Sequence, residues 1–224
     1  EEGAAKLSWS QSIDLGDGVI TKGTFRPTIH SWRDYRLPDA LFGDSVLDIG
    51  SWDGYFAFEA ERRGASDVLA VDKWECTDGI DSGGSGYASF LFAKKCRESK
   101  VRQLCSSVYN LKKHKIGQFD MVLFIQVFYH LQDPFLAIRI LSDLCKKRLV
   151  IETLLDATWC KLPAMIFYPD SELGKDSSTW WGPNEPCIRA MLDLCGFKTV
   201  TKTWEVKHPE LANTVNRACF IAER

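Results

Sequence analysis

Acidic and glycine residues in the segment 45–54, Ser-Val-Leu-Asp-Ile-Gly-Ser-Trp-Asp-Gly, have the spacing of a ligand-binding loop. The apolar residues at its start suit a buried parallel strand, and the segment 55–64 has the pattern of a helix that ends at a glycine. A strand, a glycine loop and a helix in this order form the nucleotide crevice of a doubly wound sheet. The loop has the pattern D-x-G-x-x-x-G, so Asp48 adds a carboxylate where a pyrophosphate would be repelled. The loop therefore favours a ligand with a cationic or neutral end.

A second carboxylate, Asp72, ends the next predicted strand, 67–72. An acid at this point, about 20 residues beyond the glycine loop, typically accepts hydrogen bonds from ribose hydroxyls. The loop, the strand and the terminal acid together resemble the S-adenosylmethionine (SAM) site of class I methyltransferases. The predicted cofactor contacts on the loop and at the neighbouring strand ends are Asp48, Gly50, Ser51, Trp52, Gly54, Asp72, Ser107, Val108, Gln126 and Tyr129. The alternative is a Rossmann-like sheet with ordinary turn glycines and a capping aspartate.

Candidate groups for proton transfer follow or end two further predicted strands, 119–126 and 148–153. Methyl transfer is an in-line displacement at the carbon on a sulfonium, in which the enzyme aligns the nucleophile, excludes water and removes a proton if necessary. We predict His130 or Glu152 as the general base and place Tyr129 beside the sulfonium. The alternatives are a histidine bonded to a backbone carbonyl and a glutamate that partners a loop or cap.

Several elements must bring these residues together, and they predict an α/β fold. We expect a Rossmann-like, seven-stranded, mostly parallel sheet with helices on both faces, which is the class I methyltransferase fold. The catalytic domain covers 45–224, and 1–44 is a preceding strap or lid. An aromatic-rich insertion around 154–183 is predicted to cover the substrate, with Thr153, Trp180 and Trp181 on the acceptor. The other expected elements are strands at 101–108, 197–204 and 216–222, and helices at 30–36, 87–98, 134–145 and 185–195.

The composition is that of an ordinary globular protein with no strong charge bias. The 224 residues are 45% hydrophobic and carry a net charge of −2, so no global electrostatic feature favours nucleic acid or a membrane. The longest apolar run, 121–125, is too short to span a bilayer. The lysine-rich segments 112–115 and 146–148 are interpreted as solvated surfaces. The eight cysteines form no C-x-x-C pair, which favours buried reduced thiols and a cytoplasmic location, and no residue set has metal-ligand spacing.

Three sequence segments resemble the tRNA wobble-uridine carboxymethyltransferase (CmoB-like) group of class I methyltransferases. They are residues 49–55, Tyr129-His130 with Pro134, and Ile151-Glu152-Thr153-Leu154. The resemblance runs from about Leu15 to the C-terminus. It also places Lys22 at a cofactor position and Arg217 at an anion-binding position on the substrate side. Other carboxylate-binding positions of the group have no match between Gly23 and Leu37, so the resemblance implies SAM rather than carboxy-SAM.

The sequence thus predicts a SAM-dependent methyltransferase that acts at oxygen or nitrogen of a small-molecule acceptor. S-adenosylhomocysteine would be its product. One alternative is a tRNA wobble-uridine-type (carboxy)methyltransferase, with tRNA as the partner. The other is a SAM-binding protein without catalytic activity.

Overall fold

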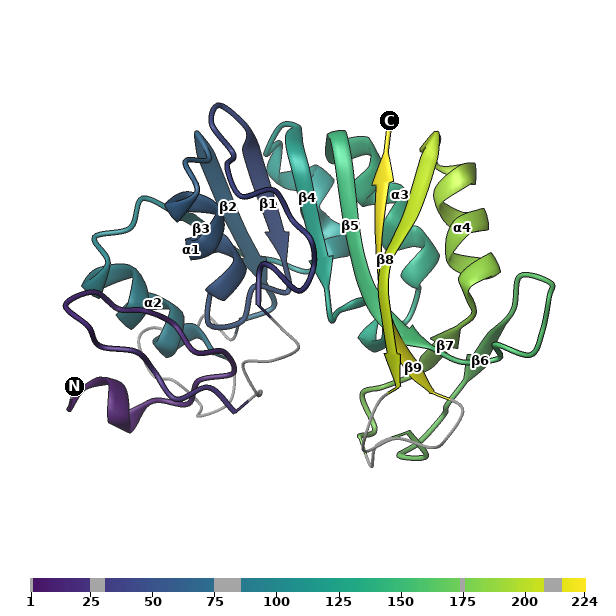
Figure 1. The fold of residues 1–224 in the computed structure, drawn as a ribbon, viewed down its shortest axis with the longest axis horizontal. Coiled ribbons are helices and arrows are strands. Elements are labelled where there is room, and N and C mark those ends of the chain that lie inside the picture. Colours follow the sequence, from purple (N-terminus) through teal and green to yellow (C-terminus); the bar gives the residue numbers. More distant parts are fainter. Residues whose placement is uncertain (1, 25–30, 75–85, 174–175, 208–214) are drawn as a thin grey trace. The chain divides into compact units, whose positions relative to one another are not determined.

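The computed structural model describes residues 2–24, 31–74, 86–173, 176–207 and 215–224 (Figure 1). The chain divides into two compact units, Glu1–Leu111 and Lys112–Arg224. The strands of its seven-stranded sheet run β3-β2-β1 in the first unit and β4-β5-β9-β8 in the second. Within the described ranges, no helix has both the length and the apolarity to cross a membrane.

The first unit contains the predicted strand–loop–helix segment. Strands β1 (Ser45–Ile49), β2 (Asp67–Asp72) and β3 (Arg102–Cys105) are parallel, with Val46 opposite Val68. The apolar side chains of β1 and β2 are buried, as expected for strands covered on both faces, whereas Leu104 of β3 is only partly buried. The helices are α1 (Tyr55–Arg62) and α2 (Tyr87–Cys96), and a 3₁₀ helix, η1, spans Ala4–Lys6.

The segment before β1 packs on the first unit through aromatic side chains. Trp32 and Tyr35 are buried, and both rings lie against Phe56 of α1. An isolated antiparallel bridge joins Asp14 and Ile20. The predicted helix at 30–36 is wrong for its described part, because residues 31–36 form consecutive turns that Leu37-Pro38 ends.

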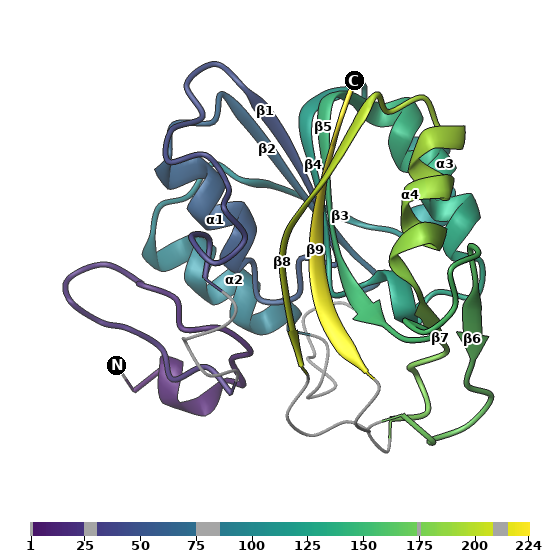
Figure 2. The same ribbon diagram turned by 45° about the vertical axis from the view of Figure 1, so that its right-hand side comes forward.

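The second unit is built on β4 (Phe119–Ile125), every residue of which is buried. It pairs in parallel with β5 (Cys145–Leu155), and β9 (Asn216–Glu223) and β8 (Thr199–Lys207) complete this part of the sheet as antiparallel strands. Helices α3 (Pro134–Leu144) and α4 (Glu185–Leu194) lie side by side (Figure 2).

Capping residues define where these two helices begin. Asp133 accepts a hydrogen bond from the Leu136 amide, and Asn184 accepts one from the Cys187 amide. Each helix has proline in its first turn, as the sequence predicted. The 3₁₀ helices η2 (Val108–His114) and η3 (Phe128–His130) follow β3 and β4, so the strand expected at 101–108 ends earlier, at Cys105.

The predicted aromatic insertion contains a small hairpin rather than one irregular loop. Strand β6 (Met165–Phe167) pairs with β7 (Trp181–Pro183) in an antiparallel register that places Phe167 opposite Trp181. The indole ring of Trp181 packs on the Phe167 ring at 4.8 Å. The short strands carry little alternation, so periodicity alone gave no signal for them.

The cysteines are mostly free thiols. Those at 96, 145, 160, 187, 195 and 219 are unpaired, whereas Cys105 is disulfide-bonded. The expectation of reduced thiols is therefore wrong at Cys105. Sequence spacing cannot exclude such a bond, because the distance between two Cα atoms in the fold decides which cysteines can pair.

Candidate active site

The glycine loop connects β1 to α1 in a conformation that depends on positive φ angles. Gly50 and Gly54 have φ of +75° and +92°, and Trp52 between them has +49°. The amides of Gly50 and Ser51 both donate to the carbonyl of Val71 on β2, at 2.9 and 3.2 Å. A Cβ atom at Gly54 would lie 2.5 Å from the ring of Phe58. The loop is therefore held close to the strand end and to the helix it precedes.

Asp48 lies under this loop as a buried carboxyl group. It is 2% exposed and accepts a hydrogen bond of 2.7 Å from the Ser51 hydroxyl. Burial raises the pKa of Asp48 to about 7, and the charges of Asp72 and Asp53 also raise it. Among the described residues, no lysine, arginine or histidine forms an ion pair with Asp48. The site thus holds a buried acid that a cationic ligand would stabilise in its charged form.

Asp72 ends β2, as predicted, and its carboxylate faces the glycine loop. It accepts hydrogen bonds from the backbone amides of Trp52 at 2.8 Å and Lys73 at 2.6 Å, one on each oxygen. Burial raises the pKa of Asp72, although part of the side chain is accessible. Each oxygen can accept a further hydrogen bond. The predicted contact with ribose hydroxyls remains a prediction.

Asp53 is a residue of the loop that sequence analysis did not select. Its buried carboxylate accepts hydrogen bonds from the amides of Ser10 at 2.7 Å and Gln11 at 3.0 Å. Burial raises its pKa to about 6, and these hydrogen bonds partly oppose the increase. Asp53 therefore joins the N-terminal segment to the glycine loop. The only sequence signal was that it is an additional acid within the D-x-G-x-x-x-G pattern.

Other contacts fix the same N-terminal segment on α2. The Ser89 hydroxyl donates to the carbonyl of Ser8, and the buried Trp9 ring packs on the edge of Phe92. A Cβ atom at Gly23 would lie 2.4 Å from the Gln11 backbone, so the two parts of the segment lie close together. Lys22 is exposed beside this contact. Its cofactor role is not tested by these contacts.

The remaining predicted cofactor residues have different environments. Trp52 is 41% exposed, and its carbonyl accepts a hydrogen bond from the Trp74 indole. Ser107 and Val108 lie after β3, where the Ser107 hydroxyl accepts from the Tyr109 amide at 3.4 Å. Gln126 in the second unit has a φ of +62°, and its amide donates to the Glu152 carbonyl. This strained conformation directly after β4 is typical of a functional position.

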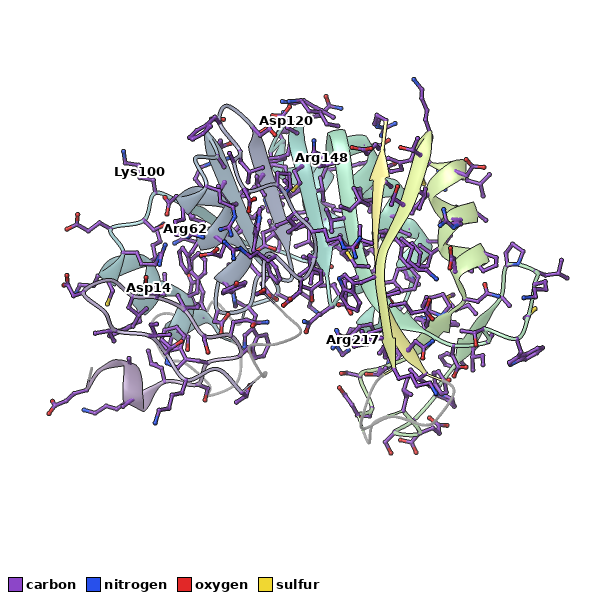
Figure 3. The ribbon with its side chains drawn as sticks, in the orientation of Figure 1. Asp14, Arg62, Lys100, Asp120, Arg148 and Arg217 are labelled. Atoms are coloured by element: carbon purple, nitrogen blue, oxygen red, sulfur yellow. The ribbon has the colours of Figure 1, made fainter. Side chains whose placement is uncertain are left out.

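Tyr129, Glu152 and Arg217 form one buried cluster in the second unit. The Arg217 guanidinium makes two hydrogen bonds to Glu152, at 2.7 and 2.9 Å, and reaches the Tyr129 hydroxyl at 3.4 Å. Leu154 lies opposite Arg217 in the β5–β9 register, so Glu152 and Arg217 project from the same face. Figure 3 labels Arg217 on β9. Sequence analysis had assigned the three residues separately and did not identify this ion pair.

This cluster limits what its members can do chemically. Glu152 is fully buried, and both of its carboxylate oxygens bind the guanidinium. Both oxygens are thus occupied by the buried ion pair with Arg217. The predicted role of Glu152 as general base is not tested by this geometry and stays a prediction. Burial raises the pKa of Tyr129 to about 12, so its phenol is a hydrogen-bond donor at neutral pH.

His130 follows Tyr129 at the end of η3. Its Nδ1 atom lies 2.9 Å from the Ser178 carbonyl and 3.1 Å from the Ser178 hydroxyl. Desolvation of the ring lowers the pKa of His130, although the residue is exposed at the surface. This contact matches the alternative to a general base, which was a histidine bonded to a backbone carbonyl. It leaves the Nε2 atom available. The predicted role as general base is not tested by this geometry.

The predicted acceptor-binding residues lie around this cluster. The Trp180 amide donates to the Tyr129 carbonyl, and its indole donates to Ser177. The Trp181 indole donates to the Leu131 carbonyl. Thr153 is fully buried, and its hydroxyl has no hydrogen-bond partner within the described residues. No described group of three or more histidine, cysteine or acidic side chains could hold a metal.

The class of protein is given by comparison with known families. A methyltransferase domain family matches residues 25–195, and the chain belongs to this family. This confirms the predicted methyltransferase class, and the observed sheet confirms the predicted fold. The glycine loop, Tyr129 and Glu152 fall within the matched range, whereas Arg217 and residues 1–24 lie outside it.

Several curated proteins are similar to this chain in sequence. The tRNA U34 carboxymethyltransferase of Dichelobacter nodosus is 30% identical over 210 residues, which cover 85% of this chain and 62% of that protein. The enzyme of the same name from Psychromonas ingrahamii is 26% identical over 168 residues, which cover 69% and 44%. The chain thus spans about half the length of these relatives. A ubiquinone biosynthesis O-methyltransferase of Acinetobacter baumannii is 29% identical over 116 residues, 52% of this chain and 45% of that protein.

Solved structures share the fold at low sequence identity. The N-terminal domain of EvdMO1, determined with S-adenosylhomocysteine and D-fucose, superimposes with a TM-score of 0.70 at 14% identity. The alignment covers 99% of this chain and 94% of that domain. Magnesium protoporphyrin IX methyltransferase from Synechocystis, determined with SAM, gives a TM-score of 0.55 at 17% identity, covering 82% and 71%.

Proposed function

We propose that this protein binds SAM at the glycine loop and transfers its methyl group to oxygen or nitrogen of a small-molecule acceptor. The observation that carries the proposal is the buried, unpaired carboxyl group of Asp48 beneath a loop that also contains Asp53 and faces Asp72. Burying such an acid without a cation is unfavourable. The sulfonium and amino groups of SAM supply the missing positive charge. Family membership and the cofactors named with the solved relatives support the same ligand.

The proposal is tested by titrating the purified chain with SAM in a calorimeter and comparing Asp72→Ala with the unsubstituted protein. Two ribose hydroxyls would lose a charge-assisted acceptor, so we expect a loss of affinity on the order of 10-fold to 100-fold. Lys73→Ala is the matched control, because the Lys73 backbone amide that contacts Asp72 is retained. Equal dissociation constants for Asp72→Ala and the unsubstituted protein would exclude Asp72 from the site.

In the second unit, His130 is the candidate base for an acceptor that must lose a proton. His130→Ala should lower turnover by about 100-fold or more and leave SAM affinity nearly unchanged. The assay uses transfer of radiolabel from methyl-labelled SAM into a small-molecule extract, followed by isolation of the product. If His130→Ala transfers the methyl group as fast as the unsubstituted protein, His130 is not the base, and alignment of the acceptor with SAM is sufficient for transfer. Failure of any extract to accept label would favour the non-catalytic alternative.

The tRNA wobble-uridine reaction is the second candidate, favoured by the names of the relatives and by Arg217, Tyr129 and Lys22. We prefer SAM over carboxy-SAM because Glu152 already neutralises Arg217 within this chain. An additional carboxylate would have to compete with that buried ion pair. Mass spectrometry of the copurifying cofactor distinguishes the two, since carboxy-SAM would overturn the preference. A salt titration of tRNA binding tests the macromolecular partner.

The role of the segment 1–44 and the cellular location of the protein are two further proposals. The segment 1–44 would act as a lid on the cofactor loop, which the Asp53 contacts with Ser10 and Gln11 support. A cytoplasmic location is supported by the six free thiols, though not by Cys105. Fractionation of cells that produce the protein tests the location.

A further inference from the structure

The hydrogen-bond acceptors around His130 determine which of its ring nitrogens carries the proton. A backbone carbonyl oxygen can only accept a hydrogen bond, and Nδ1 lies 2.9 Å from the Ser178 carbonyl. Nδ1 must therefore carry the hydrogen in the neutral ring, which leaves the lone pair on Nε2. No described residue donates a hydrogen bond to Nε2.

The Ser178 side chain is prevented from reversing this arrangement. A serine hydroxyl at 3.1 Å could donate to Nδ1 and would then favour the opposite tautomer. Its hydrogen is instead directed to Asp176, because the Ser178 hydroxyl donates to the Asp176 carboxylate at 2.6 Å. The same carboxylate oxygen accepts the Ser178 amide at 2.8 Å and so fixes the turn that presents the carbonyl. Both Ser178 oxygens are thus acceptors toward His130.

We propose that Asp176 and Ser178 are positioning residues that hold His130 in the Nδ1–H tautomer, so that Nε2 is the atom that takes the proton from the acceptor. This inference rests on the proposed function for its catalytic consequence, whereas the tautomer itself does not. In the reaction the acceptor O–H or N–H bond breaks, its proton passes to Nε2, and the acceptor lone pair forms the bond to the methyl carbon. The C–S bond breaks at the same time, and S-adenosylhomocysteine leaves as a neutral thioether.

The charged and titratable groups that face His130 define how this arrangement responds to pH. Asp176 favours the imidazolium, Arg217 opposes it, Glu152 favours it, and Tyr129 packs on the ring at 4.3 Å. Burial outweighs the acids and lowers the pKa of His130. The imidazole is therefore neutral at pH 7, which is the state a general base requires.

Nitrogen NMR of the full chain labelled at histidine tests the tautomer without any assay of activity. The sequence has four histidines, so His130→Gln assigns the signal. We expect Nδ1 of His130 to have the shift of a proton-bearing nitrogen and Nε2 that of an unprotonated one. The reverse pattern in the unsubstituted protein would overturn the inference and leave the proposed methyl transfer untouched.

Two substitutions of Asp176 separate geometry from charge. Asp176→Asn keeps an oxygen that can accept from the Ser178 amide and hydroxyl, so the tautomer should persist. Loss of the negative charge should move the acidic limb of the kcat/KM profile to lower pH. Asp176→Ala removes the oxygen that accepts from both the Ser178 amide and the Ser178 hydroxyl. We then expect a mixture of His130 tautomers and a fall in kcat of roughly 10-fold, the scale of other groups that orient histidines. An Asp176→Ala protein with unchanged tautomer and kcat would refute the positioning role, and unchanged His130 signals with no turnover in any variant would refute only the proposed function.

Discussion

Replacing Asp48 with asparagine should make the protein without ligand more stable at high pH and abolish its response to SAM. The Asp48 pKa is about 7 in the folded protein and 3.8 in the ordinary, solvated state. Because the folded state holds the proton more tightly, the folded protein binds more protons than the unfolded one between these values. Stability therefore falls as pH rises from about 4 to 7, and the buried charge is fully unfavourable above that range.

The size of the effect follows from the pKa difference. A shift of about three units corresponds to roughly 4 kcal/mol at about 1.4 kcal/mol per unit. Asparagine has no charge to bury, but its NH₂ group would face donors, since the carboxylate accepts from the Ser51 hydroxyl and is also bonded to the Ala57 amide. One unsatisfied amide costs about 1–3 kcal/mol. The expected net gain at pH 8 is thus about 1–3 kcal/mol, and at pH 4 the sign reverses because aspartic acid is protonated there.

Urea denaturation at pH 4 and pH 8, with and without saturating SAM, measures both predictions. The unsubstituted protein should gain stability from SAM that rises with the logarithm of ligand concentration over Kd, and Asp48→Asn should gain little. Ser51→Ala serves as a control that disturbs the same hydrogen bond but keeps the acid. A difference in stability between Asp48→Asn and the unsubstituted protein that does not change with pH would refute the reasoning, as would retained SAM stabilisation.

Three other predictions concern contacts that the sequence did not reveal. Asp53→Ala should release the Ser10–Gln11 backbone, each lost charge-assisted bond costing about 1.5–3 kcal/mol locally, and hydrogen exchange at those two amides should accelerate while the β4 amides stay protected. Gly54→Ala should destabilise the fold by about 1–3 kcal/mol, measured by urea unfolding, because a Cβ there meets Phe58 at 2.5 Å and φ is positive; a neutral result would mean that the loop rearranges freely. Glu152→Gln should cost about 3–5 kcal/mol of stability by leaving Arg217 buried without a counter-charge, whereas the double variant Glu152→Gln with Arg217→Met should recover part of it; equal losses in both would show that the pair is not coupled.

The sequence predicted the strands, the glycine loop and the helix start of the first unit well because their determinants are local. Strand β2 has the expected bounds, and β1 and the start of α1 fall within the predicted segments, since the apolar runs and the glycines act over short distances. Asp48 in β1 and Asp72 at the end of β2 lie beside the loop for the same reason. The backbone partners of Asp53 could not be foreseen, because they lie 42 and 43 residues away in a segment without periodicity.

In the second unit, the sequence indicated candidate residues through their positions in the predicted elements, and it did not indicate which side chains contact one another. Glu152 and Arg217 were both selected, yet their pairing depends on the antiparallel register of β5 with β9 across 65 residues of sequence. Asp176 and Ser178 were missed because they lie in the aromatic insertion, where neither helical nor strand spacing marks a residue. Side-chain networks of this kind depend on the path of loops, and only the folded chain shows it.

The anchoring of the N-terminal segment has a consequence for the order in which the chain folds during its synthesis. Trp9 is translated before its packing partner Phe92 and the hydroxyl of Ser89, which are made about 80 residues later. At about 5–20 residues per second, this interval is roughly 4–16 seconds. Throughout it, an apolar indole has no native site to occupy. The segment around Trp9 can therefore dock only after α2 has been translated.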